Sequence, residues 1–216
     1  MTTKNTTKNT TKNTTKKTTK NTTKNTTKKT TKKTTKKITK NTTKKTTKQN
    51  KNFVFDLDYT LYSPEDVDET NTIMFYKSFK EQKFLNRLLR SLDGNCYIFS
   101  NGNEPHVDEV TKKMKLQTIM KDMANIDEYN NEKPHRDAFE HVISKFGLKK
   151  TEPTYFFEDN IDNLETAKKH YNWKTILIDP DENTESTPAF VDFVFPNIRS
   201  ALLFIKHISS FGQNFL

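Results

Sequence analysis

The sequence predicts an α/β fold, in which a parallel sheet carries helices on both of its faces. Short apolar segments alternate with segments of helical periodicity from residue 52 onward. The apolar segments have the hydrophobicity expected of strands that are buried on both sides. Polar residues gather directly after these segments. Because ligands in such folds bind beyond the carboxyl ends of the strands, that edge is the expected site.

The first predicted strand begins at Phe53 and runs into two carboxylates, Asp56 and Asp58, with Thr60 on the following turn. A polar, acidic loop comes next, and apolar residues at helical spacing then predict a long helix. The predicted elements of this half are the loop Ser63–Thr72, the helix Ile73–Leu92, the strand Asn95–Ser100, helices at Glu104–Met114 and Gln117–Met123, and a short segment of undefined type near Ile126.

The second half continues the alternation. A helix with its apolar residues at Ala138, Phe139, Val142 and Phe146 is expected to end at Gly147. The predicted elements are the helix Pro134–Phe146, the strand Thr154–Phe157, the helix Ile161–Tyr171, the strands Lys174–Ile178 and Asp192–Phe195, and a closing helix at Ile198–Ser210.

Residues 1–51 differ in kind from the predicted domain at 52–216. They repeat TTKN or TTKK and hold 18 of the 37 basic residues and none of the 27 acidic ones. The tail therefore accounts for the net charge of +10, and the domain by itself is acidic. Because the tail has almost no large apolar residue, it cannot offset the entropy cost of folding, and we expect it to be disordered.

Two interpretations of this basic, low-complexity tail stay open. Its lysines would attract polyanions such as nucleic acid through release of counterions, without reading sequence. Alternatively, the repeat expanded without a selected role. The chain has no apolar run long enough for a membrane span and no apolar signal core, and the lone Cys96 is expected to be a reduced core residue. An intracellular protein is expected, in the cytoplasm, with the nucleus or a viral factory as alternatives.

Asp56 and Asp58 carry the first chemical signal. Residues two apart on a strand share a face, and two like charges at the end of a buried strand repel unless a cation lies between them. The segment FVFDLDYT therefore predicts a divalent-metal and nucleophile site at the carboxyl end of a strand.

Three later segments add matching polar groups in series. YIFSNG places Ser100, Asn101 and Gly102 after a strand, and NEKPHRDAF places Lys133 just before a helix. FFEDNIDNL then places two acids, Glu158 and Asp159, after another strand. Any one of these segments is also compatible with an ordinary turn, a surface lysine or an acidic helix start.

In series, the four motifs resemble those of the haloacid dehalogenase-like hydrolases, which implies a Rossmann-like core and a Mg²⁺-dependent phosphomonoesterase. The resemblance implies that Asp56 is the nucleophile that forms an aspartyl-phosphate and that Asp58 is the general acid and base. It further implies the following ligands: Ser100, Asn101, Gly102 and Lys133 at the substrate phosphate, and Asp56, Asp58, Glu158 and Asp159 at the metal, Glu158 through water, with Asp162 as a weaker candidate.

The details resemble the pyrimidine 5'-nucleotidase branch, but the chain departs from it in one respect. Members of that branch usually carry a helical cap of several dozen residues between the first two motifs, whereas only 43 residues separate Asp56 from Ser100. We therefore expect a reduced or absent cap, an open active site, and a substrate that is a nucleotide, a small phosphate ester or a macromolecular phosphate.

Two other classes of function stay open at this stage. One is a catalytically idle domain that uses the fold for binding, and the other is a nucleic-acid-associated protein recruited by its basic tail. The five histidines carry no zinc-site spacing and give no further prediction: His106, His135, His141, His170 and His207.

Overall fold

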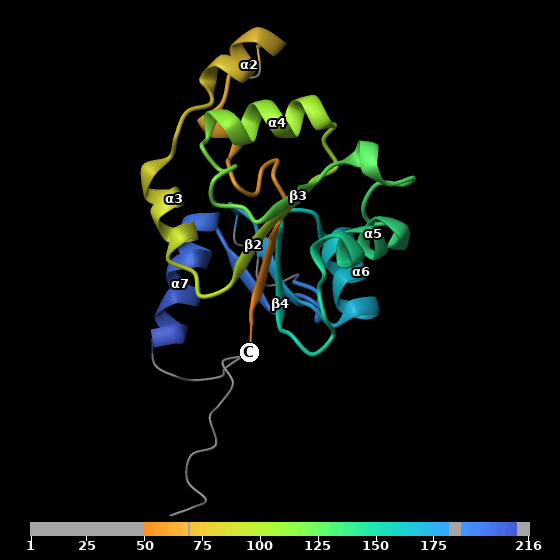
Figure 1. Ribbon diagram of the computed structural model, residues 1–216. Coiled ribbons are helices and arrows are strands. Elements are labelled where there is room, and N and C mark those ends of the chain that lie inside the picture. The colour runs from red at the N-terminus through yellow and green to blue at the C-terminus, as the bar shows by residue number, and fades with distance from the viewer. Residues whose placement is uncertain (1–49, 69, 182–186, 211–216) are drawn as a thin grey trace, which may run out of the picture. The chain divides into compact units, whose positions relative to one another are not determined.

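Six parallel strands form a single sheet in the part of the chain that the computed structural model describes, residues 50–68, 70–181 and 187–210 (Figure 1). The predicted disorder of residues 1–51 concerns a segment that lies almost wholly outside the described residues. The strand order is β3-β2-β1-β4-β5-β6. The strands are β1 Asn52–Phe55, β2 Asn95–Phe99, β3 Asp122–Ala124, β4 Thr154–Glu158, β5 Lys174–Ile178 and β6 Phe193–Phe195.

Helices follow most of the strands, as the alternation in the sequence predicts. Among the described residues they are α2 Thr72–Ser78, α3 Lys83–Arg90, α4 Glu104–Lys113, α5 Arg136–Phe146, α6 Ile161–Tyr171 and α7 Ile198–Ser210, with short 3₁₀ helices η1 Pro64–Asp66 and η2 Ile126–Glu128. Gly147 ends α5 in the left-handed conformation. In this same part of the chain, no helix is both long and apolar enough to cross a bilayer.

The helices cover both faces of the sheet, which confirms the predicted fold class. Alternate residues of β1 point to opposite sides, so that Phe53 and Phe55 pack with α3, α4 and α7, whereas Val54 packs with α5 and α6. Figure 1 shows α3 and α7 on one side of the strands and α5 and α6 on the other. Because all strands are parallel, their carboxyl ends lie along one edge, and the loops that follow them meet there.

The single helix predicted at Ile73–Leu92 is wrong. The chain forms two helices, α2 and α3, separated by a non-helical stretch that begins at Phe79, whose backbone is extended. The ring of Phe79 is buried against Tyr62, 4.8 Å between centroids, whereas the apolar face of α3 packs into the sheet core. The extended backbone at Phe79 ends α2 while its ring packs against Tyr62, so the apolar spacing continues across a break in the helix.

The helix predicted at Gln117–Met123 is also wrong. These residues form turns that lead into β3, a three-residue edge strand paired with β2 through Tyr97↔Asp122 and Phe99↔Ala124. Such a strand is too short for its side-chain pattern to differ from that of a helical turn. Its identity depends on its backbone hydrogen bonds to β2.

Asp192, just before β6, anchors the last strand, and its removal should weaken the fold. Both of its carboxylate oxygens accept from Lys168 Nζ at 2.6 Å, and one also accepts from the backbone N–H of Thr175 at 2.8 Å. Burial acts to raise the pKa of Asp192, but these hydrogen bonds outweigh it and hold the pKa below its ordinary value. The ionised group therefore stabilises the fold above the unfolded-state pKa, and this contribution is lost as the pH falls through the folded-state pKa.

We expect Asp192→Asn to lower the free energy of unfolding at neutral pH by about 1.5–3 kcal/mol, the range for hydrogen bonds to a charged group. Urea denaturation at neutral and acidic pH measures this. The difference between the two proteins should shrink towards acidic pH, where the wild-type carboxylate is itself protonated. An equal difference at all pH values would contradict this account.

Candidate active site

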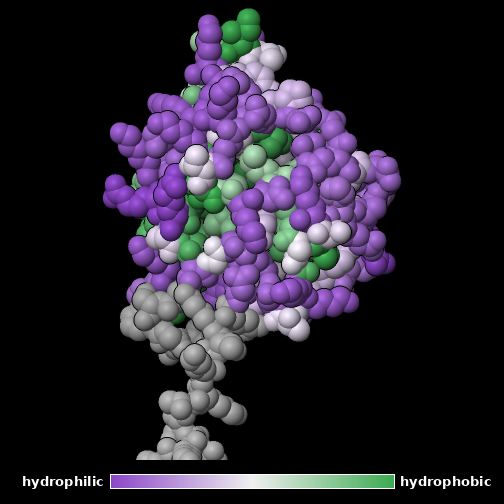
Figure 2. Space-filling view, viewed as in Figure 1, coloured by the Kyte–Doolittle hydropathy of each residue, from purple (hydrophilic) through white to green (hydrophobic). Residues whose placement is uncertain are grey.

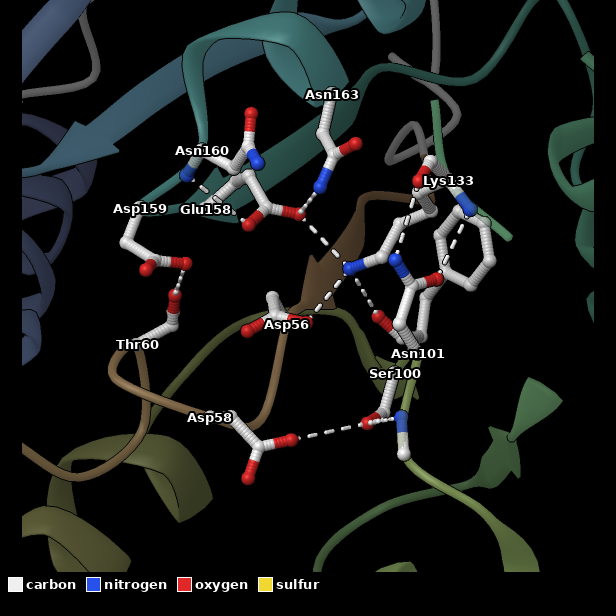
Figure 3. Close-up of polar contacts among 12 residues, drawn as sticks. Asp56, Asp58, Thr60, Ser100, Asn101, Lys133, Glu158, Asp159, Asn160 and Asn163 are labelled. Carbon is white, nitrogen blue, oxygen red and sulfur yellow. Dashed lines mark hydrogen bonds and ion pairs between the residues drawn. The ribbon is translucent and has the colours of Figure 1, made fainter. Parts of the chain in front are cut away.

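The side chains singled out in the four sequence motifs lie at one edge of the sheet, beyond the carboxyl ends of β1, β2 and β4 (Figure 3). Asp56 directly follows β1, and its backbone N–H donates to the carbonyl oxygen of Phe157 in β4 at 2.9 Å. Ser100 follows β2, and Glu158 is the last residue of β4. Parallel pairing of these neighbouring strands brings residues more than 40 positions apart together.

Lys133 is the centre of the site. Its ammonium group donates to Asp56 Oδ1 at 2.6 Å, to Glu158 Oε2 at 2.8 Å and to the carbonyl oxygen of Phe99 at 2.8 Å. It also lies over the ring of Phe99, 5.0 Å from the centroid. The side chain is 1% exposed, which only an ion pair of this kind makes tolerable.

Glu158 is fixed from several directions, and Asp159 beside it is accessible. Besides the bond to Lys133, Glu158 Oε2 accepts from Asn163 Nδ2 at 3.0 Å, and Oε1 accepts from the backbone N–H of Asn160. Asp159 is exposed as a residue. Oxygens of Asp56, Glu158 and Asp159 lie within 4.8 Å of one another, and the described residues include no other such group of three potential ligands.

These three carboxyl groups lie close together, and the pKa of each is raised. Burial raises the pKa of Asp56 to about 7 against the lowering effect of Lys133, and repulsion from Glu158 adds to the rise. Burial likewise raises the pKa of Glu158 to about 7, with Lys133 opposing and Asp159 adding to the shift. The pKa of Asp159 is also raised, because its carboxyl group is partly desolvated by the surrounding site although the residue as a whole is exposed, and repulsion from Asp56 adds to the rise. One ammonium group therefore compensates three carboxylates incompletely, and a divalent cation is what this set of oxygen ligands fits.

The carboxylate of Asp58 does not belong to this group of three. Its Oδ1 accepts from Tyr62 Oη at 2.5 Å and faces His106 Nε2 at 2.6 Å, and its Oδ2 is 3.4 Å from Ser100 Oγ. Burial acts to raise the pKa of Asp58, but the hydrogen bonds from His106 and Tyr62 outweigh it and lower the pKa. The Asp58 side chain remains 29% exposed, so it is accessible from solvent.

In the segment SNG, the side chains of Ser100 and Asn101 bind the protein backbone, whereas the sequence analysis placed them at the substrate phosphate. The side-chain amide of Asn101 binds the backbone of Lys133 at both ends, donating to its carbonyl oxygen at 3.1 Å and accepting from its N–H at 2.9 Å. Ser100 Oγ accepts from the N–H of Gly102 at 2.9 Å. Asn101 therefore holds the loop that carries Lys133, and Ser100 Oγ lies 3.4 Å from Asp58 Oδ2. Asp162, in the first turn of α6, lies outside the three-carboxylate group.

His106 is one of the site residues that the sequence interpretation missed. It contacts Asp58 although 48 positions separate them, and it belongs to the first turn of α4, where its backbone N–H donates to the Asn103 side chain that caps the helix. The one available signal is its position: a helix that starts at the site edge, just after the Ser100 motif, presents its first turn to the site.

The comparisons agree with this geometry. The family model of haloacid dehalogenase-like hydrolases matches residues 81–170, which include Ser100, Lys133, Glu158 and Asp159. Residues 81–170 are therefore similar to the haloacid dehalogenase-like hydrolases, the family that the sequence motifs resemble. A search of curated protein sequences gives no significant match.

Solved structures of this family share the fold at low sequence identity. They include the L-2-haloacid dehalogenase from Xanthobacter autotrophicus, at 15% identity and a TM-score of 0.53 over 73% of this chain and 99% of that chain. A Bacillus subtilis protein, YfnB, described as a HAD-hydrolase bound to magnesium, has 13% identity and a TM-score of 0.54 over the same shares. A protein of Lactobacillus plantarum assigned as a phosphoglycolate phosphatase has 13% identity and a TM-score of 0.55, also over 73% and 99%. The structural neighbours of this chain thus include both dehalogenases and phosphatases.

Proposed function

We propose that the domain is a Mg²⁺-dependent phosphomonoesterase that works through an aspartyl-phosphate on Asp56. The observation that carries the proposal is the separation of two acidic sites. Asp56 with Glu158 and Asp159 forms a charged group around Lys133, whereas Asp58 lies apart with its own donors and is accessible to solvent. The first group suits attack on phosphorus, and the second suits handling of protons.

In the proposed reaction an Asp56 carboxylate oxygen attacks phosphorus, and the bond to the leaving oxygen breaks. The leaving oxygen takes a proton from Asp58. In the second step Asp58 takes a proton from a water molecule, whose oxygen attacks phosphorus, and Asp56 is released with inorganic phosphate. A bound phosphate dianion would raise the pKa of Asp58 by repulsion, which favours the protonated acid at the start of the first step.

Asp56, Glu158 and Asp159 would hold the magnesium ion, which would neutralise phosphoryl charge and position the phosphate for in-line attack. Lys133 places its positive charge next to Asp56. Ser100 Oγ, 3.4 Å from Asp58 Oδ2, would donate to a phosphoryl oxygen. The chain therefore supplies a nucleophile, an acid and donors for phosphate at one edge of the sheet.

Dehalogenation, the activity named for some neighbours, fits this site less well. A halide leaves as a stable anion and needs no proton, so the held carboxylate of Asp58 would have no role. Displacement at a carbon–halogen bond also involves no phosphoryl charge that a divalent cation would have to neutralise. The arrangement around Asp58 therefore favours a substrate with an alkoxide leaving group.

Metal removal tests the proposal. Full-length protein treated with a chelator should release no phosphate from a panel of nucleotides, sugar phosphates, phosphopeptides and end-phosphorylated oligonucleotides, and Mg²⁺ should restore release. Mg²⁺ should also raise the midpoint of thermal denaturation, because an ion that binds only the folded state stabilises it by about 2.7 kcal/mol at a hundredfold excess over Kd. Release that persists at full rate in excess chelator would contradict the metal dependence.

The same panel separates the remaining alternatives. A catalytically idle binding domain would bind phosphate esters without releasing phosphate. Recruitment by the tail predicts that removing residues 1–51 lowers activity on oligonucleotide ends and leaves activity on free nucleotides unchanged. The nucleotidase branch, the polyanion partner and an intracellular location stay predictions from the sequence.

A further inference from the structure

We propose that His106 is a positioning residue of the active site, which holds the Asp58 carboxylate on the leaving-group side of the substrate. The inference rests on the proposed phosphomonoesterase activity and adds a residue to it. His106 Nε2 lies 2.6 Å from Asp58 Oδ1, and its side chain is only 15% exposed. Its ring is therefore a fixed partner of Asp58 rather than a surface side chain that happens to be near.

The other ring nitrogen is also held. His106 Nδ1 lies 3.0 Å from Tyr76 Oη, which comes from α2. An ionised Asp58 can only accept, so Nε2 carries the hydrogen and donates to it, and Nδ1 of a neutral ring then accepts from the Tyr76 hydroxyl. The ring of His106 is also stacked on that of Phe75, 6.1 Å between centroids and 19° between planes. Contacts on three sides thus fix its orientation.

Tyr62, in the turn that follows β1, is the second donor that holds the Asp58 carboxylate. Its hydroxyl donates to the same oxygen of Asp58, Oδ1, at 2.5 Å, and its ring packs on Phe79. With Oδ1 bound by two donors, Oδ2 is left directed to Ser100 Oγ, 3.4 Å away. The carboxylate is therefore held in one rotamer, with one oxygen supported and the other turned to the phosphate-binding motif.

Gly102 makes room for this arrangement. A Cβ on Gly102 would lie 2.6 Å from His106 Cδ2, which is closer than Cβ atoms approach other heavy atoms, and 3.1 Å from Ser100 Oγ, which is tighter than most Cβ contacts. Its backbone is not in the left-handed region, so space and not conformation requires glycine here. From the sequence we expected Gly102 to lie at the substrate phosphate. In the structure, the His106 ring is the group that lies closest to the position of a Cβ on Gly102.

The segment between the first two motifs, which includes α2, helps to hold His106 in place. The residues that hold His106 belong to α2 and its flanks, the short stretch that stands where the family's nucleotidase branch has a larger cap. Figure 1 shows α2 beyond α4, away from the body of the sheet, and Figure 2 shows hydrophobic surface at this projecting end, where Ile73 and Met74 of α2 are exposed. This segment reaches the acid through Tyr76, Phe75 and His106.

The test uses leaving groups that differ in their need for a proton. Glycerol phosphate loses an alkoxide that must be protonated, whereas 4-nitrophenyl phosphate loses a phenolate that leaves without a proton. We expect His106→Ala in the full-length, Mg²⁺-supplied protein to lower kcat/KM for glycerol phosphate by about tenfold to a hundredfold, and for 4-nitrophenyl phosphate much less. Because kcat/KM covers only the steps through leaving-group release, this contrast isolates the acid step.

Two further variants guard against a general loss of structure. His106→Gln retains an amide donor and should recover part of the loss. The exposed His170 on α6 provides the matched control, and His170→Ala should leave both values unchanged. Circular dichroism and thermal denaturation would establish that each variant is folded.

The outcomes are distinguishable from those of the proposed function itself. An active wild-type protein whose His106→Ala variant loses equal activity on both substrates, or none on either, would overturn the inference and leave the phosphomonoesterase proposal standing. A wild-type protein that releases phosphate from neither ester in the presence of Mg²⁺ would overturn both.

Discussion

Replacement of Asp56 by Asn is expected to reduce phosphate release by about 10⁴-fold or more, since the loss of a nucleophile removes the covalent route and not merely a binding contact. The variant should remain folded, because Asn is isosteric and still accepts from Lys133, which keeps its partner Glu158. Phosphate release from the full-length protein with saturating Mg²⁺ measures the effect.

A matched control for Asp56 is Asp108, an exposed residue of α4 that accepts from Gln117 Nε2 at 2.7 Å. Asp108→Asn makes the same chemical change away from the site and should retain full activity. If Asp56→Asn were as active as Asp108→Asn, Asp56 could not be the nucleophile. The reaction would then need direct attack by water.

Replacement of Lys133 by Met is expected to have the largest effect on stability, lowering the free energy of unfolding by about 3–5 kcal/mol in the absence of metal. Removal of one partner from a buried ion pair leaves uncompensated charge, here on both Asp56 and Glu158. Activity should fall as well, by about 10³-fold or more, because the charge next to the nucleophile is lost. Urea denaturation and phosphate release measure the two effects.

Mg²⁺ should restore part of the stability of Lys133→Met, since a cation at the three carboxylates replaces the missing charge. Adding Glu158→Gln to Lys133→Met should also recover stability, but not activity, because charge and countercharge are then removed together. Lys145, whose ion pairs with Glu128 and Asp122 are partly exposed, is the control, and Lys145→Met should cost less than about 1 kcal/mol. If Lys133→Met were as stable as Lys145→Met, the buried ammonium group would not be what balances the carboxylates.

Sequence patterns identified the sheet because the strands are distinctive locally. Segments such as FVF and TYFF are short, apolar and followed by acids, and each became a strand of the parallel sheet. The helices were less certain, because apolar spacing does not say where a helix stops. The periodicity of residues 73–92 is the same whether one helix or two carry it, and the break at Phe79 accompanies the packing of its ring against Tyr62.

The sequence by itself determined which residues meet at the edge of the sheet. Asp56, Ser100 and Asp159 each follow a strand, and Glu158 is the last residue of one. In a parallel sheet the carboxyl ends of the strands share one edge, so the convergence of these residues follows from the alternation alone. Lys133 follows no strand, and its prediction came from the resemblance to the family.

Only the tertiary structure decided which of these side chains contact one another. In the structure, Asp58 lies apart from the other carboxylates, the Asn101 amide binds the backbone of Lys133, and His106 contacts Asp58. These contacts depend on side-chain rotamers and on the packing of α2 against α4, which residues far apart in the chain determine together. No local pattern of residue types encodes such contacts, because the same types at the same spacing would be equally compatible with a solvated surface.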